Sequence, residues 1–108
     1  MWYLNTEEET LINLDKLESI EIRPRYEEGG GYNITGFFGN GNRNVLYSIS
    51  PENDDEWDEI EKGLSYKDKA NIFLNALQVL FFSGKTFSNN LSLFNEETIL
   101  NFIKESKL

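Results

Sequence analysis

Apolar residues in the first half of the chain recur at every second position, the pattern of strands that bury one face. Three such runs lie at residues 20–24, 34–38 and 45–49, separated by turn sequences at 28–31 and 39–42. Both turns are rich in Gly and Asn, which tolerate the positive φ angles of hairpin turns. The pattern therefore predicts three antiparallel strands in a meander.

Two shorter strand candidates precede the meander, at residues 2–5 and 10–13. Three consecutive glutamates, Glu7 to Glu9, lie between them. A further alternation of apolar residues, over 86–93, is typical of an edge strand. We therefore expect the sheet to contain four to five strands.

The second half of the chain changes to a helical period. Apolar residues recur at intervals of three and four between residues 66 and 81, with Ser65 as the N-cap candidate and Gly84 as the C-cap candidate. A shorter helix is predicted from the cap Asn95 through about Ser106. The fold class that follows is α+β, an antiparallel meander followed by a long central helix and a shorter C-terminal helix packed on one face.

The length of 108 residues suits one domain with one core. Within residues 1–108 we expect a sheet over 1–50, an acidic loop over 51–64 and a helical part over 65–108. The longest apolar run has four residues, and the opening residues lack the pattern of a signal peptide. These features favour a cytoplasmic protein that does not bind membranes.

The amino-acid composition excludes several classes of chemical function. The chain has no Cys and no His, so thiolate nucleophiles, imidazole acid–base catalysis and common zinc sites are excluded. Paired carboxylates can catalyse without histidine, but here they cluster in polar runs where ordinary ionisation is expected. The net charge of −9 disfavours direct binding of nucleic acid. We therefore expect no enzymatic activity and no cofactor.

The most acidic stretch, residues 51–61, contains seven acidic residues and no basic one. Such a loop could dock into a basic cleft, with Trp57 as an interface anchor. The alternative is that the charges only keep the protein soluble while Trp57 and Ile60 fold back onto the core. The candidate partner-binding residues are Glu52, Asp54, Asp55, Glu56, Trp57, Asp58, Glu59 and Glu61.

Calcium is a second hypothesis for the same carboxylates, because hard cations take oxygen ligands. The spacing disfavours it. If Asp54 began an EF-hand loop, Glu59 would stand where the motif has Gly, and Ser65 would replace the final Glu. We therefore predict no metal site.

A second face of the predicted sheet is the other candidate interface. If the long helix covers the side that holds Ile34 and Val45, the alternate residues of the strands face away from it. Those residues are exposed, covered by another chain, or covered by the N-terminal strands or the last helix. The candidate interface residues on this face are Arg23, Arg25, Phe37 and Leu46.

Small size, one acidic segment and the missing catalytic side chains favour a non-enzymatic, stoichiometric binding protein. We predict an acidic inhibitor or immunity-type protein that covers the basic cleft of a toxin or a nucleic-acid enzyme such as a nuclease. The alternative is an accessory or self-assembling subunit, such as a homodimer, that uses the second sheet face.

Overall fold

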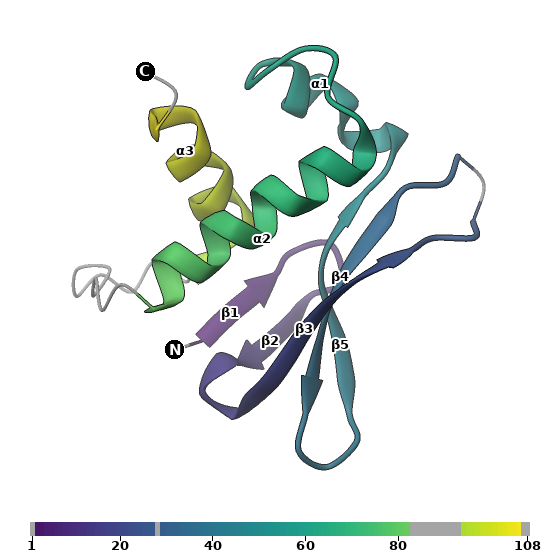
Figure 1. The fold of residues 1–108 in the computed structure, drawn as a ribbon. Helices are drawn as coiled ribbons and strands as arrows, with labels where there is room; N and C mark the ends of the chain where they lie inside the picture. Colours follow the sequence, from purple (N-terminus) through teal and green to yellow (C-terminus); the bar gives the residue numbers. More distant parts are fainter. Residues whose placement is uncertain (1, 28, 83–93, 107–108) are drawn as a thin grey trace.

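The computed structural model describes residues 2–27, 29–82 and 94–106, and these ranges form an α+β fold (Figure 1). The strands are β1 (Trp2–Asn5), β2 (Thr10–Asn13), β3 (Leu17–Pro24), β4 (Tyr32–Phe38), β5 (Arg43–Ile49) and β6 (Phe94–Asn95). The α-helices are α1 (Asp54–Asp58), α2 (Tyr66–Phe82) and α3 (Glu96–Ser106), with short 3-10 turns at Leu14–Lys16 and Pro51–Asn53. The predicted fold class is confirmed.

The strands divide between two sheets instead of forming one. The antiparallel meander β3-β4-β5 has the predicted strand order, while β1 lies between antiparallel β2 and parallel β6 in a second sheet. Tyr3 of β1 pairs with Phe94 of β6, and their rings meet edge to face at 5.6 Å between centroids. A pairing between the two ends of the chain leaves no local signal in the sequence, so periodicity could not predict it.

Both predicted helix starts are confirmed by their caps. The Ser65 hydroxyl accepts the N–H of Asp68 at 3.1 Å, and the Asn95 side-chain oxygen accepts the N–H of Thr98 at 3.1 Å. These bonds satisfy N–H groups that lack a partner within the helix. The predicted cap at Gly84 and the predicted strand at 86–93 lie outside the described residues.

A bulge in β5 changes which residues face the core. Ile34 lies opposite Tyr47 and Thr35 lies opposite Val45, so Leu46 is an extra residue in the ladder. Because two residues of a bulged strand then oppose one on its partner, strict alternation fails at this point. Leu46 and Tyr47 are both buried, at 0% and 7% exposure. The prediction that Leu46 lies on the second face is therefore wrong.

The bulge is also where the two sheets meet. The Tyr3 hydroxyl donates to the Leu46 carbonyl, and the Asn5 amide donates to the Val45 carbonyl, each at 2.7 Å. Side chains of β1 thus satisfy backbone oxygens along the outer edge of β5. On the inner side, α2 lies across β4 and β5, and α3 packs beside α2 (Figure 1).

Candidate functional site: an acidic surface on a buried tryptophan

The acidic stretch is ordered and partly helical, which corrects the expectation of a loop. Ser50 and Asn53 cap each other at its start, and the Asn53 amide donates to the Ser48 carbonyl of β5 at 2.8 Å. The single helical turn of α1 follows directly. Residues 51–58 are therefore held against the end of β5 at a fixed position.

Trp57 points inward from this turn. Its side chain is fully buried, and its indole N–H donates to the Tyr47 hydroxyl at 3.1 Å. The Tyr47 ring stacks on Phe73 of α2, with 4.2 Å between centroids. The prediction that Trp57 is an interface anchor is therefore wrong, while the alternative that it folds back onto the core is confirmed. Ile60 packs against the same core and is partly buried.

The acidic side chains of this segment fall into two groups. Asp54 pairs with Lys69 at 3.3 Å and accepts the Tyr66 hydroxyl at 3.3 Å. Lys69 is only 4% exposed, so Asp54 neutralises a buried cation and belongs to the fold. The remaining acidic side chains are exposed: Glu52, Asp55, Glu56, Asp58, Glu59 and Glu61.

Two other segments bring carboxylates to the same region. Loss of part of its hydration raises the pKa of the exposed Glu56 carboxyl, Lys104 lowers it, and the charges of Glu96 and Glu97 raise it further. Burial also raises the pKa of Glu96, with Glu7 adding to the shift. The turn between β1 and β2 is tied to α3 because the Thr6 hydroxyl donates to Glu96.

We define the acidic surface as eight carboxylates from α1 and its flanks, the β1–β2 turn and the start of α3, all exposed except the half-buried Glu96: Glu7, Glu52, Asp55, Glu56, Asp58, Glu59, Glu96 and Glu97. One cation lies beside it, since Lys104 of α3 pairs with Glu59 at 3.3 Å. Sequence reasoning missed Glu7 and Glu96. Both residues belong to short acidic clusters that are visible in the sequence, but only the fold shows that these clusters lie near the segment 51–61.

These carboxylates do not form a cation cage. Across residues 2–27, 29–82 and 94–106, no three Asp or Glu side chains gather closely enough to hold a metal ion. The acidic surface therefore offers dispersed negative charge, which suits a broad basic surface better than a point ligand.

The second sheet face carries a different arrangement. The Arg23 guanidinium lies 4.8 Å from the centre of the Phe37 ring and pairs with Glu21 at 2.8 Å. Arg25 is mostly buried and pairs with Glu27 at 2.7 Å. A shallow groove of about 730 Å³ crosses this face, lined by Glu8, Arg23, Pro24, Tyr26, Asn33, Thr35, Arg43, Asn44 and Val45. Because of the bulge, Val45 lies here in place of Leu46.

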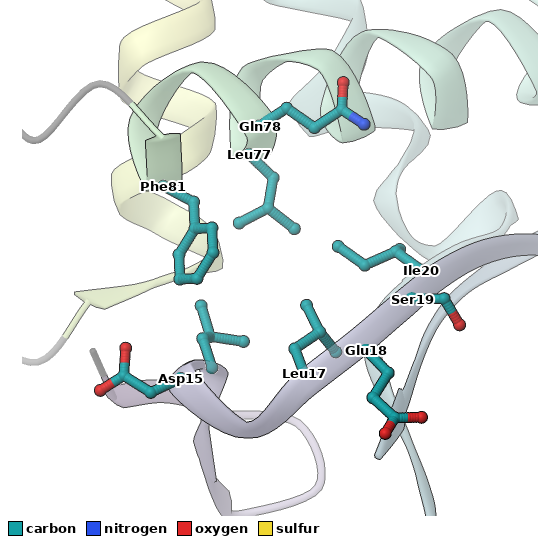
Figure 2. A pocket seen from close by; sticks show the side chains of 9 residues that line it. Asp15, Leu17, Glu18, Ser19, Ile20, Leu77, Gln78 and Phe81 are labelled. Carbon is teal, nitrogen blue, oxygen red and sulfur yellow. The ribbon is translucent and has the colours of Figure 1, made fainter. Parts of the chain in front are cut away.

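An apolar cavity of about 340 Å³ lies between α2 and the start of β3. Side chains of Leu17, Ile20, Leu77 and Phe81 surround it, while the polar ends of Glu18 and other labelled residues point away (Figure 2). Specific small-molecule sites combine an apolar lining with polar groups that fix the ligand's orientation. The polar ends drawn around this cavity do not point inward, so it offers packing surface without such groups.

None of the described helices is long and apolar enough to cross a membrane. Comparison with protein-family models, curated proteins and solved structures gave no match to this chain.

Proposed function

We propose that the protein is a non-enzymatic, stoichiometric binding protein whose acidic surface docks on a basic surface of another protein. An inhibitor or immunity-type protein that covers the basic cleft of a cytoplasmic toxin or nucleic-acid enzyme fits this chemistry. The observation that carries the proposal is the convergence of three separate chain segments, represented by Glu7, Glu56 and Glu96, on one negatively charged region.

This convergence opposes folding. Carboxylates that share a region repel one another, which destabilises the compact state. A surface that served only solubility could distribute the same charges more widely at a lower cost in stability. Concentrated charge instead accelerates the encounter with an oppositely charged partner.

The rigid attachment of α1 supports the same proposal. Trp57 and Asn53 fix the backbone from inside, so the outer carboxylates of α1 keep their relative positions. A preorganised surface loses less conformational entropy on binding than a free loop does. The buried tryptophan therefore contributes to binding indirectly, by positioning the charges.

The test compares two variants with the same change in net charge. One removes charge from α1, as Asp55→Asn, Glu56→Gln and Asp58→Asn together. The control removes three exposed charges elsewhere, as Glu18→Gln, Asp68→Asn and Glu105→Gln together. Asp54 is left intact in both variants because its loss would leave Lys69 buried and unpaired.

Immobilised wild-type protein is first used to isolate a partner from native cell extract at low salt, and the partner is then purified. Association rates are measured for each variant at increasing salt. We expect the α1 variant to associate about tenfold or more slowly than wild type, with a weaker salt dependence, while the control stays close to wild type. Equal rates for the two variants would overturn the role of the acidic surface.

A further inference from the structure

The outer edge of the β3-β4-β5 sheet carries a pattern that fits a second copy of itself. Among the described residues, β3 pairs with β4 on one side and with no strand on the other. Glu21 and Arg23 are exposed on it, with Ile22 between them. An unpaired strand edge presents N–H and C=O groups that can pair with another strand.

The register shows which backbone groups face outward. The Arg25 N–H donates to the Gly31 carbonyl at 3.0 Å, and the ladder continues regularly from there through Arg23 and Glu21. Opposed residues in an antiparallel ladder alternate between hydrogen-bonded and non-hydrogen-bonded pairs. Arg25, Arg23 and Glu21 therefore direct their backbone groups to β4. Ile20 and Ile22 direct theirs to the free edge.

The charges along β3 select one self-pairing register. In an antiparallel pair centred on Ile22, Glu21 lies opposite Arg23 of the second copy, and the two-fold axis repeats this contact. Shifting the centre to residue 21 places Glu21 opposite Glu21. Shifting it to residue 23 places Arg23 opposite Arg23, and Glu21 then faces Arg25, which is mostly buried and already paired with Glu27. Opposite charges directly across from each other stabilise a strand pair, and like charges destabilise it.

We propose that two copies of the protein pair antiparallel through β3 in this register, forming a continuous six-stranded sheet across a two-fold axis. Backbone bonds form reciprocally between the Ile22 residues, and Ile20 donates to the Pro24 carbonyl of the second copy. Each copy uses its single β3 edge, so the assembly closes as a dimer.

Two features confine the pairing to the middle of β3. Pro24 has no N–H, and the ladder is irregular between Leu17 and Ser19. The register also sets Pro24 of the second copy opposite Ile20, which lines the apolar cavity. The dimer leaves the acidic surface free and does not depend on the proposed function.

Charge reversal tests the dimer. Sedimentation analysis of the wild-type protein from low to high micromolar concentration should show a monomer–dimer equilibrium. Glu21→Arg and Arg23→Glu, made singly, should each raise the dissociation constant about tenfold or more, because each creates two like-charge contacts. The double variant should restore the wild-type value. Arg43→Glu makes the same charge change on exposed β5 and should leave the equilibrium unchanged.

Amide exchange gives a second readout that does not use variants. The Ile20 and Ile22 amides should exchange rapidly at low concentration and become protected as the dimer forms, while Glu21 and Arg23 amides stay protected throughout. A protein that remains monomeric, a dimer that both single variants leave intact, or a dimer without new protection at Ile20 and Ile22 would overturn the proposal. Circular dichroism checks that every variant is folded.

Discussion

The two sides of the segment 51–61 differ in what they contribute to folding. On the inner side, the Trp57 indole and the Asn53 amide both reach the Tyr47 hydroxyl, at 3.1 and 3.3 Å, and these contacts lie in the core. On the outer side, loss of part of its hydration raises the pKa of Glu56, and the neighbouring carboxylates raise it further. One short stretch of chain therefore joins strong stabilisation to electrostatic repulsion.

The contrast between the two sides separates the role of Trp57 from the role of the acidic residues around it in the sequence. Trp57 and the acidic residues are neighbours in the chain, and a tryptophan among charges is typical of a binding hot spot. In the structure the tryptophan anchors the segment and the charges face outward. Changes to the inner side should therefore affect stability, and changes to the outer side should affect binding.

The largest effect is expected from Trp57→Ala. Removing a fully buried indole leaves a cavity and should lower the free energy of unfolding by about 3–5 kcal/mol. Since small domains are stable by only about 5–15 kcal/mol, a large fraction of the protein could then be unfolded at moderate urea concentrations. Asp58→Ala, one residue away and exposed, should change stability by less than about 0.5 kcal/mol in the same urea titration. Similar losses for both variants would contradict the division into two sides.

Alkaline pH should lower the free energy of unfolding through the buried tyrosines. Burial raises the pKa of both Tyr3 and Tyr47 above the ordinary value of 10.0. At a pH well below this value, the two phenols are protonated in both the folded and the unfolded protein. Above it the unfolded state loses protons that the folded state retains, so stability falls as pH rises, by about 1.4 kcal/mol per pH unit for each tyrosine. Unfolding free energies measured from neutral to alkaline pH should show this slope.

Two variants sharpen the alkaline experiment. Tyr3→Phe should lower the slope by about 1.4 kcal/mol per pH unit, because the contribution of one buried phenol is gone. Tyr26→Phe removes a phenol that is 93% exposed and serves as the control for the loss of a tyrosine side chain. If Tyr26→Phe lowered the slope as much as Tyr3→Phe does, the buried phenols would not control stability at alkaline pH.

The sequence predicted those features of the fold that depend on neighbouring residues. Period-two runs placed β3, β4 and β5, and side-chain caps placed the starts of α2 and α3. The sequence did not predict the bulge in β5. The extra residue Leu46 breaks the alternation, so the residues of β5 before it point to the opposite faces of the sheet from those expected. The sequence also failed for the parallel pair of β1 and β6, whose residues lie at opposite ends of the chain.

The candidate site shows the same limit. Charge density drew attention to residues 51–61, which carry most of the carboxylates of the acidic surface. It could not distinguish Asp54, whose role depends on the buried Lys69, from its exposed neighbours. Nor could it add Glu7 and Glu96, which reach the surface only through tertiary packing.

The contact between β1 and the bulge should have an intermediate effect. The Asn5 amide donates to the Val45 carbonyl, and its oxygen accepts the Glu8 N–H at 3.2 Å. Asn5→Ala leaves a partly buried carbonyl without its donor and should cost about 1–3 kcal/mol in thermal or urea unfolding. Asn71→Ala, at an exposed position of α2, serves as the control and should be close to neutral. A neutral Asn5→Ala would mean that the hydrogen bonds of Asn5 contribute little to the contact between the two sheets.

The smallest change in stability, and the one most informative for function, is expected from Glu56→Gln on the outer side. Because the pKa of Glu56 is raised in the folded protein, its ionised form opposes folding, and stability falls as pH rises from acid through that raised pKa. The variant should therefore be more stable than wild type at neutral pH, by less than about 1 kcal/mol. The difference should disappear in acid, where Glu56 is protonated in both states. Glu18→Gln, exposed on β3 outside the acidic surface, provides a matched control. If Glu56→Gln is more stable yet associates more slowly with the partner, the repulsion at this surface is linked to binding. If it lowers stability instead, Glu56 supports the fold, and the contrast between the two sides of the segment fails at this residue.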